Sequence, residues 1–272
     1  MERTRGARSV PERNTPLNDI FAPVRRRLAN TAFARIEYVE QTGSTNEDAA
    51  ARLDEAQAGG LTLIADYQTS GHGRKGRTWN ALPGTSLLFT TILPRDVPGK
   101  HLWTLPFWTA SCVAGALRDL GITTQLQWPN DLLLNNRKCC GILCLSRVIG
   151  EKAWVACGVG LNVHRPSTTV EPVQPPASYL SDVQNIDRPR VLAAVLTRFA
   201  NELSLLDYPA QVARNWERAA ALAGTIYRLQ VDRESGSIQA IAQALGPTGE
   251  LIVSENGRLR IIALADARVV RS

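Results

Sequence analysis

The chain has 272 residues, a formal net charge of +6, a hydrophobic fraction of 44% and a charged fraction of 21%, which is typical of a folded globular protein. No segment approaches the roughly 20 consecutive apolar residues that span a bilayer, and the N-terminus lacks the apolar core of a secretory signal peptide. These features exclude a helical membrane protein and predict a cytoplasmic location, and the positive charge favours an anionic partner such as nucleic acid, a nucleotide or an acidic protein.

The sequence pattern divides the chain into three regions. Residues 1–30 are polar and rich in arginine, so we expect a poorly ordered extension with a short helix near residues 24–28. Residues 31–223 mix strands and helices without regular alternation, which predicts an α+β domain. Residues 224–272 contain short strands and the hairpin signal Asn256-Gly257, which predict a small β-barrel.

The expected elements follow from hydrophobic periodicity. Ser44 and Glu47 match the capping-box pattern S-x-x-E, so a helix should begin there, and Gly121 is placed to end a later helix. Helices are expected at 48–58, 102–120, 190–206 and 210–223, and a proline-rich loop at 166–178. Strands are expected at 34–39, 61–67, 86–93, 125–128, 132–134, 141–146 and 154–163, and then at 225–231, 238–245, 250–254 and 258–264. Residues 238–245 also fit helical spacing.

The cysteines give no sign of a disulfide framework or a zinc site. Their number is odd and no C-x-x-C occurs. Cys139, Cys140 and Cys144 fall in a run that reads as a buried strand, where free cysteine packs as a small hydrophobic residue. We therefore expect five free thiols: Cys112, Cys139, Cys140, Cys144 and Cys157.

The most informative segment is residues 71–79, Gly-His-Gly-Arg-Lys-Gly-Arg-Thr-Trp. Its glycines match G-x-G-x-x-G, but a dinucleotide site needs a helix directly afterwards, and here a turn and a strand follow. A kinase is also excluded, because no H-R-D or D-F-G motif occurs downstream. Glycines allow close approach to a ligand, while Arg74, Lys75 and Arg77 carry donors suited to phosphate and carboxylate. We predict an anion-binding loop; the alternative is a solvated turn.

This segment resembles the G-R-G-R-x-G-R-x-W signature of the biotin–protein ligases, with His72 where that family usually has arginine. Further blocks resemble the family in the same order and spacing: Ser44-Thr45-Asn46, Gln68, Trp128-Pro129-Asn130-Asp131 preceded by Gln127 instead of lysine, Arg137-Lys138 followed by Gly141-Ile142-Leu143, and residues 158–163. The resemblance is strong over residues 33–165 and weak beyond. It implies a mixed-sheet catalytic domain of the biotin/lipoate ligase type at 31–223 and a small C-terminal SH3-like β-barrel at 224–272.

The resemblance also implies a reaction in two steps. Biotin and ATP form biotinyl-5′-AMP and pyrophosphate, and a lysine of a biotin carboxyl carrier domain then takes the biotinyl group. Lys138 would neutralise the biotin carboxylate and the α-phosphate, and Arg74 and Arg77 would hold the adenylate and the pyrophosphate. The nucleotide-binding residues would be Gly71, Gly73, Arg74, Gly76, Arg77, Trp79, Asn130, Asp131 and Asn162, with Asp131 also a ligand of Mg²⁺.

The biotin head is a neutral ureido ring with two N–H donors and one carbonyl acceptor, which hydroxyls and amides suit. The resemblance assigns its binding, with that of the carboxylate, to Ser44, Thr45, Asn46, Gln68, His72, Gly73, Arg74 and Lys138. Ser44 has an alternative role as a helix cap, and Lys138 and Asp131 have alternatives as turn residues.

Other functions stay open. A biotin-responsive repressor that also ligates has an additional N-terminal helix-turn-helix domain, whereas about 30 residues precede the catalytic pattern here, so we expect no specific DNA binding. A lipoate–protein ligase shares the fold, but the arginine-rich glycine block argues against it. A biotin-binding module without ligation is disfavoured by the presence of Lys138, Arg74 and Arg77. A homodimer is also left open, because family members pair through sheet edges.

Overall fold

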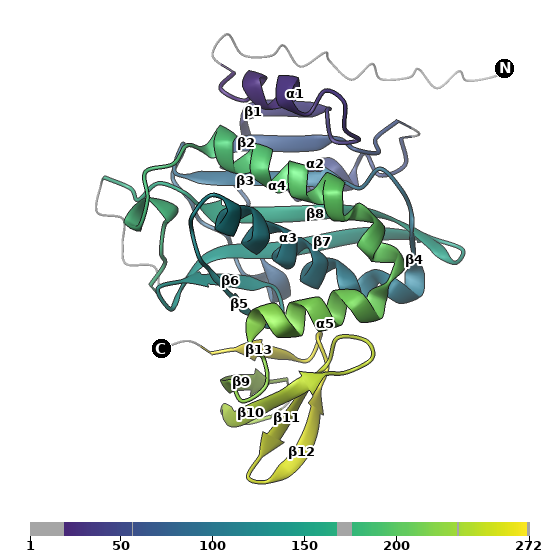
Figure 1. The fold of residues 1–272 in the computed structure, drawn as a ribbon, viewed down its shortest axis with the longest axis vertical. Coiled ribbons are helices and arrows are strands. Elements are labelled where there is room, and N and C mark those ends of the chain that lie inside the picture. The colour runs from purple at the N-terminus through teal and green to yellow at the C-terminus, as the bar shows by residue number, and fades with distance from the viewer. Residues whose placement is uncertain (1–18, 56, 168–175, 233, 271–272) are drawn as a thin grey trace, which may run out of the picture.

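The computed structural model describes residues 19–55, 57–167, 176–232 and 234–270, which form a large mixed sheet flanked by helices and a separate antiparallel sheet at the C-terminus (Figure 1). This arrangement confirms the predicted α+β class. No helix in these described ranges is long and apolar enough to cross a membrane.

The large sheet has the strand order β1-β2-β3-β8-β7-β6-β5, and β4 pairs with the start of β8. Among the described pairs, β1 and β2 run parallel and the others are antiparallel. The strands are β1 Ile36–Thr42, β2 Thr62–Gln68, β3 Ser86–Ile92, β4 Val97–Pro98, β5 Gln125–Gln127, β6 Asp131–Leu134, β7 Arg137–Ile149 and β8 Lys152–Asn162. The predicted strand at 141–146 is longer because β7 pairs with β8 along a continuous hairpin.

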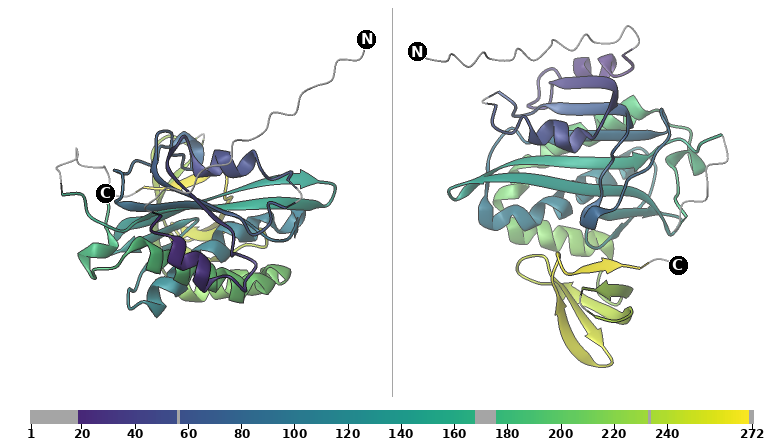
Figure 2. Two further views of the ribbon diagram at one scale, coloured as in Figure 1. Left: turned by 90° about the horizontal axis from the view of Figure 1, so that it is seen from above. Right: turned by 180° about the vertical axis from the view of Figure 1, so that it is seen from behind.

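The helices lie on both faces of this sheet, as Figure 2 shows. One face carries α1 Ala22–Arg27, α3 Leu105–Asp119, α4 Arg188–Glu202 and α5 Pro209–Ala220, and the other carries α2 Thr45–Ala50. Most side chains of α3 are buried, because this apolar helix is packed between the sheet and its neighbouring helices. Gly121, with a φ of 87°, follows α3 as predicted.

The described part of the N-terminal extension packs against the main domain. Phe21, Val24 and Leu28 repeat at helical spacing and are at most 2% exposed. They join the core beneath α4, so residues 19–30 are part of the folded body rather than a loose tail. Residues 1–18 and the middle of the predicted proline-rich loop, 168–175, lie outside the described residues.

Helix α2 is shorter than the predicted 48–58. It begins after Ser44 as the capping pattern indicates, but the Ser44 side chain makes no capping hydrogen bond. Beyond Ala50 the backbone continues in tighter turns with i to i−3 hydrogen bonds. These turns place Leu53 and Ala58 in a small core under the sheet, so tertiary packing overrides helix propensity there.

The C-terminal sheet has the strand order β12-β11-β10-β9-β13. Its strands are β9 Ile226–Val231, β10 Ile238–Leu245, β11 Leu251–Glu255, β12 Arg258–Ile262 and β13 Ala267–Val269. The ambiguous segment 238–245 is a strand, because alternate residues face the buried side of this sheet. Strand β13 was not predicted, and closure into an SH3-like barrel stays a prediction.

Candidate active site

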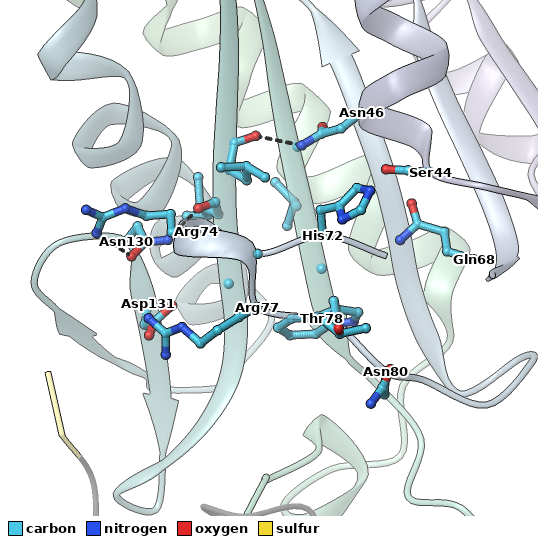
Figure 3. Close-up of a pocket in the computed structure, with 18 of the residues that line it drawn as sticks. Ser44, Asn46, Gln68, His72, Arg74, Arg77, Thr78, Asn80, Asn130 and Asp131 are labelled. Atoms are coloured by element: carbon cyan, nitrogen blue, oxygen red, sulfur yellow. Dashed lines mark hydrogen bonds between the residues drawn. The ribbon is translucent and has the colours of Figure 1, made fainter. Parts of the chain in front are cut away.

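A cavity of about 240 Å³ opens on the α2 face of the large sheet (Figure 3). The start of α2, the glycine-rich loop and the centres of β7 and β8 form its walls. All eight predicted biotin residues line it: Ser44, Thr45, Asn46, Gln68, His72, Gly73, Arg74 and Lys138. The predicted nucleotide residues that line it are Gly73, Arg74, Arg77, Trp79, Asn130, Asp131 and Asn162, whereas Gly71 and Gly76 do not.

One end of the cavity is neutral and polar. The Thr45 backbone N–H and hydroxyl both donate to Gln68 Oε1, at 2.8 and 2.9 Å. Asn46 Nδ2 donates to the Leu143 carbonyl at 3.1 Å, and Ser44 is 2% exposed beside them. Figure 3 shows Ser44, Asn46 and Gln68 around this end. Because Thr45 and Gln68 fix each other and the Leu143 carbonyl fixes Asn46, their remaining donors and acceptors are preorganised for an uncharged polar group.

The floor of the cavity consists of strand glycines. A Cβ on Gly158 would lie 2.0 Å from Asn46 Oδ1, and a Cβ on Gly160 or Gly141 would lie 2.7 or 2.9 Å from the Trp79 ring. Side chains at these positions would therefore displace the cavity walls. Sequence reasoning quoted these glycines as family blocks but did not assign them to the site; a glycine inside a predicted buried strand was the available signal.

The glycine-rich loop closes the cavity on one side. It contains a 3₁₀ turn, Arg74–Gly76, in which Lys75 and Gly76 have φ values of 56° and 69°. This left-handed conformation favours glycine, which explains Gly76 without a ligand contact. Gly71 allows a close crossing instead, because its added Cβ would lie 2.5 Å from the Trp79 carbonyl oxygen.

Lys138 is one of the cations that line the cavity. Its Nζ lies 2.7 Å from Asp131 Oδ1 and 5.4 Å from the centroid of the Trp79 ring. The side chain of Asp131 is 8% exposed and that of Lys138 is 26% exposed. The lysine is thus held by a buried carboxylate while part of its side chain still reaches the cavity.

Arg74 is held between the two sheets. Its guanidinium donates to the backbone carbonyl of Leu264, in the C-terminal region, and to Asn130 Oδ1 at 3.4 Å. Burial lowers the pKa of Arg74, Asp131 opposes this effect, and Arg77 adds to it. The exposed Arg77 lies at the rim, so the loop presents cations at two depths.

His72 links the loop to helix α2. Its Nε2 lies 2.8 Å from Glu47 Oε1, and both side chains are about half exposed or more, at 48% and 62%. Glu47 therefore contacts the loop instead of completing the predicted capping box. An exposed pair of this kind contributes little to stability, so His72 holds the loop to α2 only weakly.

Segment 177–179 forms a further wall that the sequence did not predict. The Ser178 N–H donates to the Lys138 carbonyl at 3.0 Å, and Asn162 Nδ2 donates to the Ser178 carbonyl at 3.2 Å. Tyr179 lines the cavity and lies under the Arg165 guanidinium, 4.8 Å from the ring centroid. Asn162 thus supports this wall, and Tyr179 adds an aromatic face that no motif indicated.

The described residues contain no group of three or more histidine, cysteine, aspartate or glutamate side chains that could hold a metal ion. The cysteines are free, and all but Cys144 are buried. Asp131 is the only carboxylate among the residues that line the cavity in the described part of the chain. This donor set suits an ion that arrives mainly coordinated by phosphates, as Mg²⁺ commonly does.

Comparisons with known proteins agree with this geometry. A model of the biotin/lipoate A/B protein ligase family matches residues 38–162. The biotin–[acetyl-CoA-carboxylase] ligase of Mycobacterium tuberculosis is 30% identical over 248 residues, covering 88% of this chain and 90% of the relative. The bifunctional ligase/repressor BirA of Bacillus subtilis is 28% identical, covering 84% and 72%. Biotin protein ligase from Aquifex aeolicus in complex with biotin and ATP superposes with a TM-score of 0.70 at 25% identity, covering 88% of this chain and 99% of that one.

Proposed function

The chain belongs to the biotin/lipoate A/B protein ligase family, and we infer that within it the chain is an ATP-dependent biotin–protein ligase, which forms biotinyl-5′-AMP and transfers biotin to a lysine of a carrier protein. Its substrates are ATP and biotin. The residue roles, the carrier and the metal that follow are our proposals.

One observation supports the proposal best: a neutral polar end, a lysine and an arginine-bearing glycine loop line the same cavity. Biotin has the matching order of groups, with a neutral ureido ring at one end and a carboxylate at the other. Lys138, Arg74 and Arg77 line this cavity together, so we assign Lys138 to the carboxylate and the α-phosphate and the two arginines to the phosphates. The cations lower the repulsion between two anions that must react.

In the first step a biotin carboxylate oxygen attacks the α-phosphorus of ATP. The bond from that phosphorus to the oxygen that bridges to the β-phosphate breaks, and pyrophosphate leaves with the bonding electrons. Lys138 offsets negative charge on the carboxylate and the α-phosphate, and Arg74 and Arg77 offset charge on the departing pyrophosphate. We assign Trp79, which lines the cavity, to cover the adenylate.

In the second step the ε-amine of the acceptor lysine attacks the acyl carbon of biotinyl-5′-AMP. The carbon–oxygen bond to AMP breaks, AMP leaves with the bonding electrons, and the amine loses a proton. We propose a biotin carboxyl carrier domain as the acceptor, because similar proteins are named biotin–[acetyl-CoA-carboxylase] ligases. Pairing of the ligase into a homodimer and the absence of specific DNA binding stay predictions.

We further propose that Mg²⁺ accompanies ATP and that Asp131 is its protein ligand. The carboxylate is buried and already contacts Lys138, so it would share its charge between the lysine and the ion. When bound, Mg²⁺ neutralises phosphate charge. We place the enzyme in the cytoplasm, which agrees with free cysteines and with a supply of ATP.

The test is biotinylation of a purified biotin carboxyl carrier domain by wild type, Lys138→Ala and the control Lys152→Ala. Lys152 is an exposed lysine on β8 that pairs with Asp96 away from the cavity. We expect Lys138→Ala to lose about tenfold to a hundredfold in rate, the cost of a charge-assisted hydrogen bond, and Lys152→Ala to match wild type. A folded Lys138→Ala enzyme with the wild-type rate would refute the role of Lys138.

A further inference from the structure

Thr90 is a buried hydroxyl at the polar end of the cavity that no sequence motif indicated. It lies on β3, is 0% exposed and contacts the start of helix α2 on the same face of the sheet. Its Oγ1 lies 2.9 Å from Thr45 Oγ1 and 2.7 Å from Asn46 Oδ1. Thr90 therefore contacts two of the residues assigned to the biotin head without presenting surface of its own.

The orientation of both neighbouring amides is fixed by backbone partners. The Thr45 backbone N–H can only donate, so the atom of Gln68 that faces it is the oxygen. The Leu143 carbonyl can only accept, so Asn46 presents Nδ2 to it and turns Oδ1 toward Thr90. Neither amide can be reversed without losing one of these bonds.

As a result, four oxygens form a chain that is short of one proton. The oxygens of Gln68, Thr45, Thr90 and Asn46 meet in three contacts of 2.9, 2.9 and 2.7 Å. Only the two threonine hydroxyls carry hydrogen, and each has a single proton. Whichever way these protons point, one contact joins two lone pairs, so the cluster has a surplus of acceptors.

We infer that Thr90 is a positioning residue that holds Thr45 and Asn46 with their oxygens toward the cavity, so that this end selects head groups with N–H donors. The inference rests on the proposed function. A ureido ring supplies two N–H groups to an acceptor-rich cluster, whereas a dithiolane ring such as that of lipoate supplies none. Asn46 Oδ1 occupies the space that a Cβ on residue 158 would fill, at 2.0 Å from it, so this orientation of Asn46 requires the glycine at that position.

The experiment compares Thr90→Val with Thr90→Ser and with the control Thr91→Val. Valine keeps the branched shape and removes the proton, and serine restores it. Thr91 is also 0% exposed, and its hydroxyl contacts Thr62 at 3.0 Å, but it lies on the opposite face of β3. Loss of a buried hydroxyl affects folding in both valine variants, but only Thr90 adjoins the cavity.

We expect Thr90→Val to raise the dissociation constant for biotin about tenfold and to leave the KM for ATP unchanged. The dissociation constant of Thr90→Ser should stay within about threefold of the wild-type value. Thr91→Val should lower the melting temperature and leave biotin binding unchanged. Biotin binding is measured by titration calorimetry, and the biotin-over-lipoate preference by pyrophosphate release. If Thr90→Val does not fold, Thr90→Ala replaces it.

Wild-type affinity for biotin in the folded Thr90→Val or Thr90→Ala enzyme would overturn the inference. Equal losses of biotin affinity in the Thr90 and Thr91 variants would also overturn it. Failure of Thr90→Ser to restore binding would also overturn it, because the proton would then not be the cause. A wild-type chain that releases no pyrophosphate with biotin would instead refute the proposed function, so the two failures are distinguishable.

Discussion

The cationic side chains that line the cavity differ in how many of their hydrogen-bond donors are already paired within the protein. Lys138 is paired with the buried Asp131, whereas Arg77 is exposed at the rim. Arg74 lies between these extremes, since its guanidinium contacts the Leu264 carbonyl and Asn130 but retains further donors for an anion. Retention of a bound adenylate should therefore depend on Arg74 more than on any surface cation.

We predict that Arg74→Ala releases biotinyl-5′-AMP about tenfold faster than wild type or more, because a charge-assisted hydrogen bond contributes about 1.5–3 kcal/mol. The measurement is the dissociation rate of the preformed adenylate complex. Arg147→Ala is the control, since this arginine is exposed and pairs with Asp54. Equal release rates in the two variants would contradict the role of Arg74.

Single residues were predictable from the sequence where they carry charge or belong to a motif. Lys138, Arg74 and Gln68 were assigned in this way, and the cavity brings them together. Thr90 could not be assigned, because a threonine in an apolar strand reads as an ordinary core residue until its neighbours across the sheet are known. Tyr179 could not be assigned either, because its contact with Arg165 depends on how the chain folds back.

At the scale of elements, the short 3₁₀ helix Leu180–Asp182 anchors the wall that contains Tyr179. Asp182 accepts from Arg165 at 2.8 Å and from the Tyr179 N–H at 2.9 Å. Burial alone would raise the pKa of Asp182, but these two donors and the charge of Arg137 hold it below its ordinary value of 3.8. The carboxylate therefore stabilises the fold while it is ionised.

Because the folded pKa of Asp182 is depressed, its contribution is present above the unfolded value of 3.8 and is lost as the pH falls through the folded pKa. We predict that Asp182→Asn lowers the unfolding free energy near neutral pH by no more than about 1 kcal/mol, since Arg165 is largely exposed and screened. Urea titrations at neutral and acidic pH check this. A difference from wild type that persists well below the folded pKa would contradict it.

The strands and long helices could be predicted from hydrophobic periodicity, but the residues at which they end are set by the elements that pack against them. Helix α2 ends early because Leu53 and Ala58 turn into a small core, and β7 extends because β8 pairs with its full length. Strand β13 is three residues long and pairs with β9, so its own sequence carried too little pattern to predict it.

At the scale of the whole molecule, the two sheets share contacts next to the cavity. Trp128, which precedes the segment that carries Asp131, donates its backbone N–H to the Tyr227 hydroxyl at 3.3 Å and its Nε1 to the Gly249 carbonyl at 3.1 Å. Lys75 of the glycine-rich loop pairs with Asp232 at 2.7 Å. The C-terminal sheet thus supports the cavity from outside, which single motifs could not indicate.

We predict that Tyr227→Phe lowers the unfolding free energy by about 1–3 kcal/mol, because it leaves the buried Trp128 N–H without an acceptor. Burial raises the pKa of Tyr227, in keeping with a hydroxyl held away from solvent. The control is Tyr208→Phe, because Tyr208 is 63% exposed and its replacement should change the unfolding free energy little. Denaturant unfolding measures both, and equal stability of the two variants would argue against a structural role for this contact.

The measurement that tests the central claim most directly is pyrophosphate release by the purified wild-type chain with ATP and either biotin, lipoate or no acid. A biotin–protein ligase with an acceptor-rich head pocket releases pyrophosphate with biotin and not with lipoate. Release that depends on lipoate, or no release with either acid, would contradict the account.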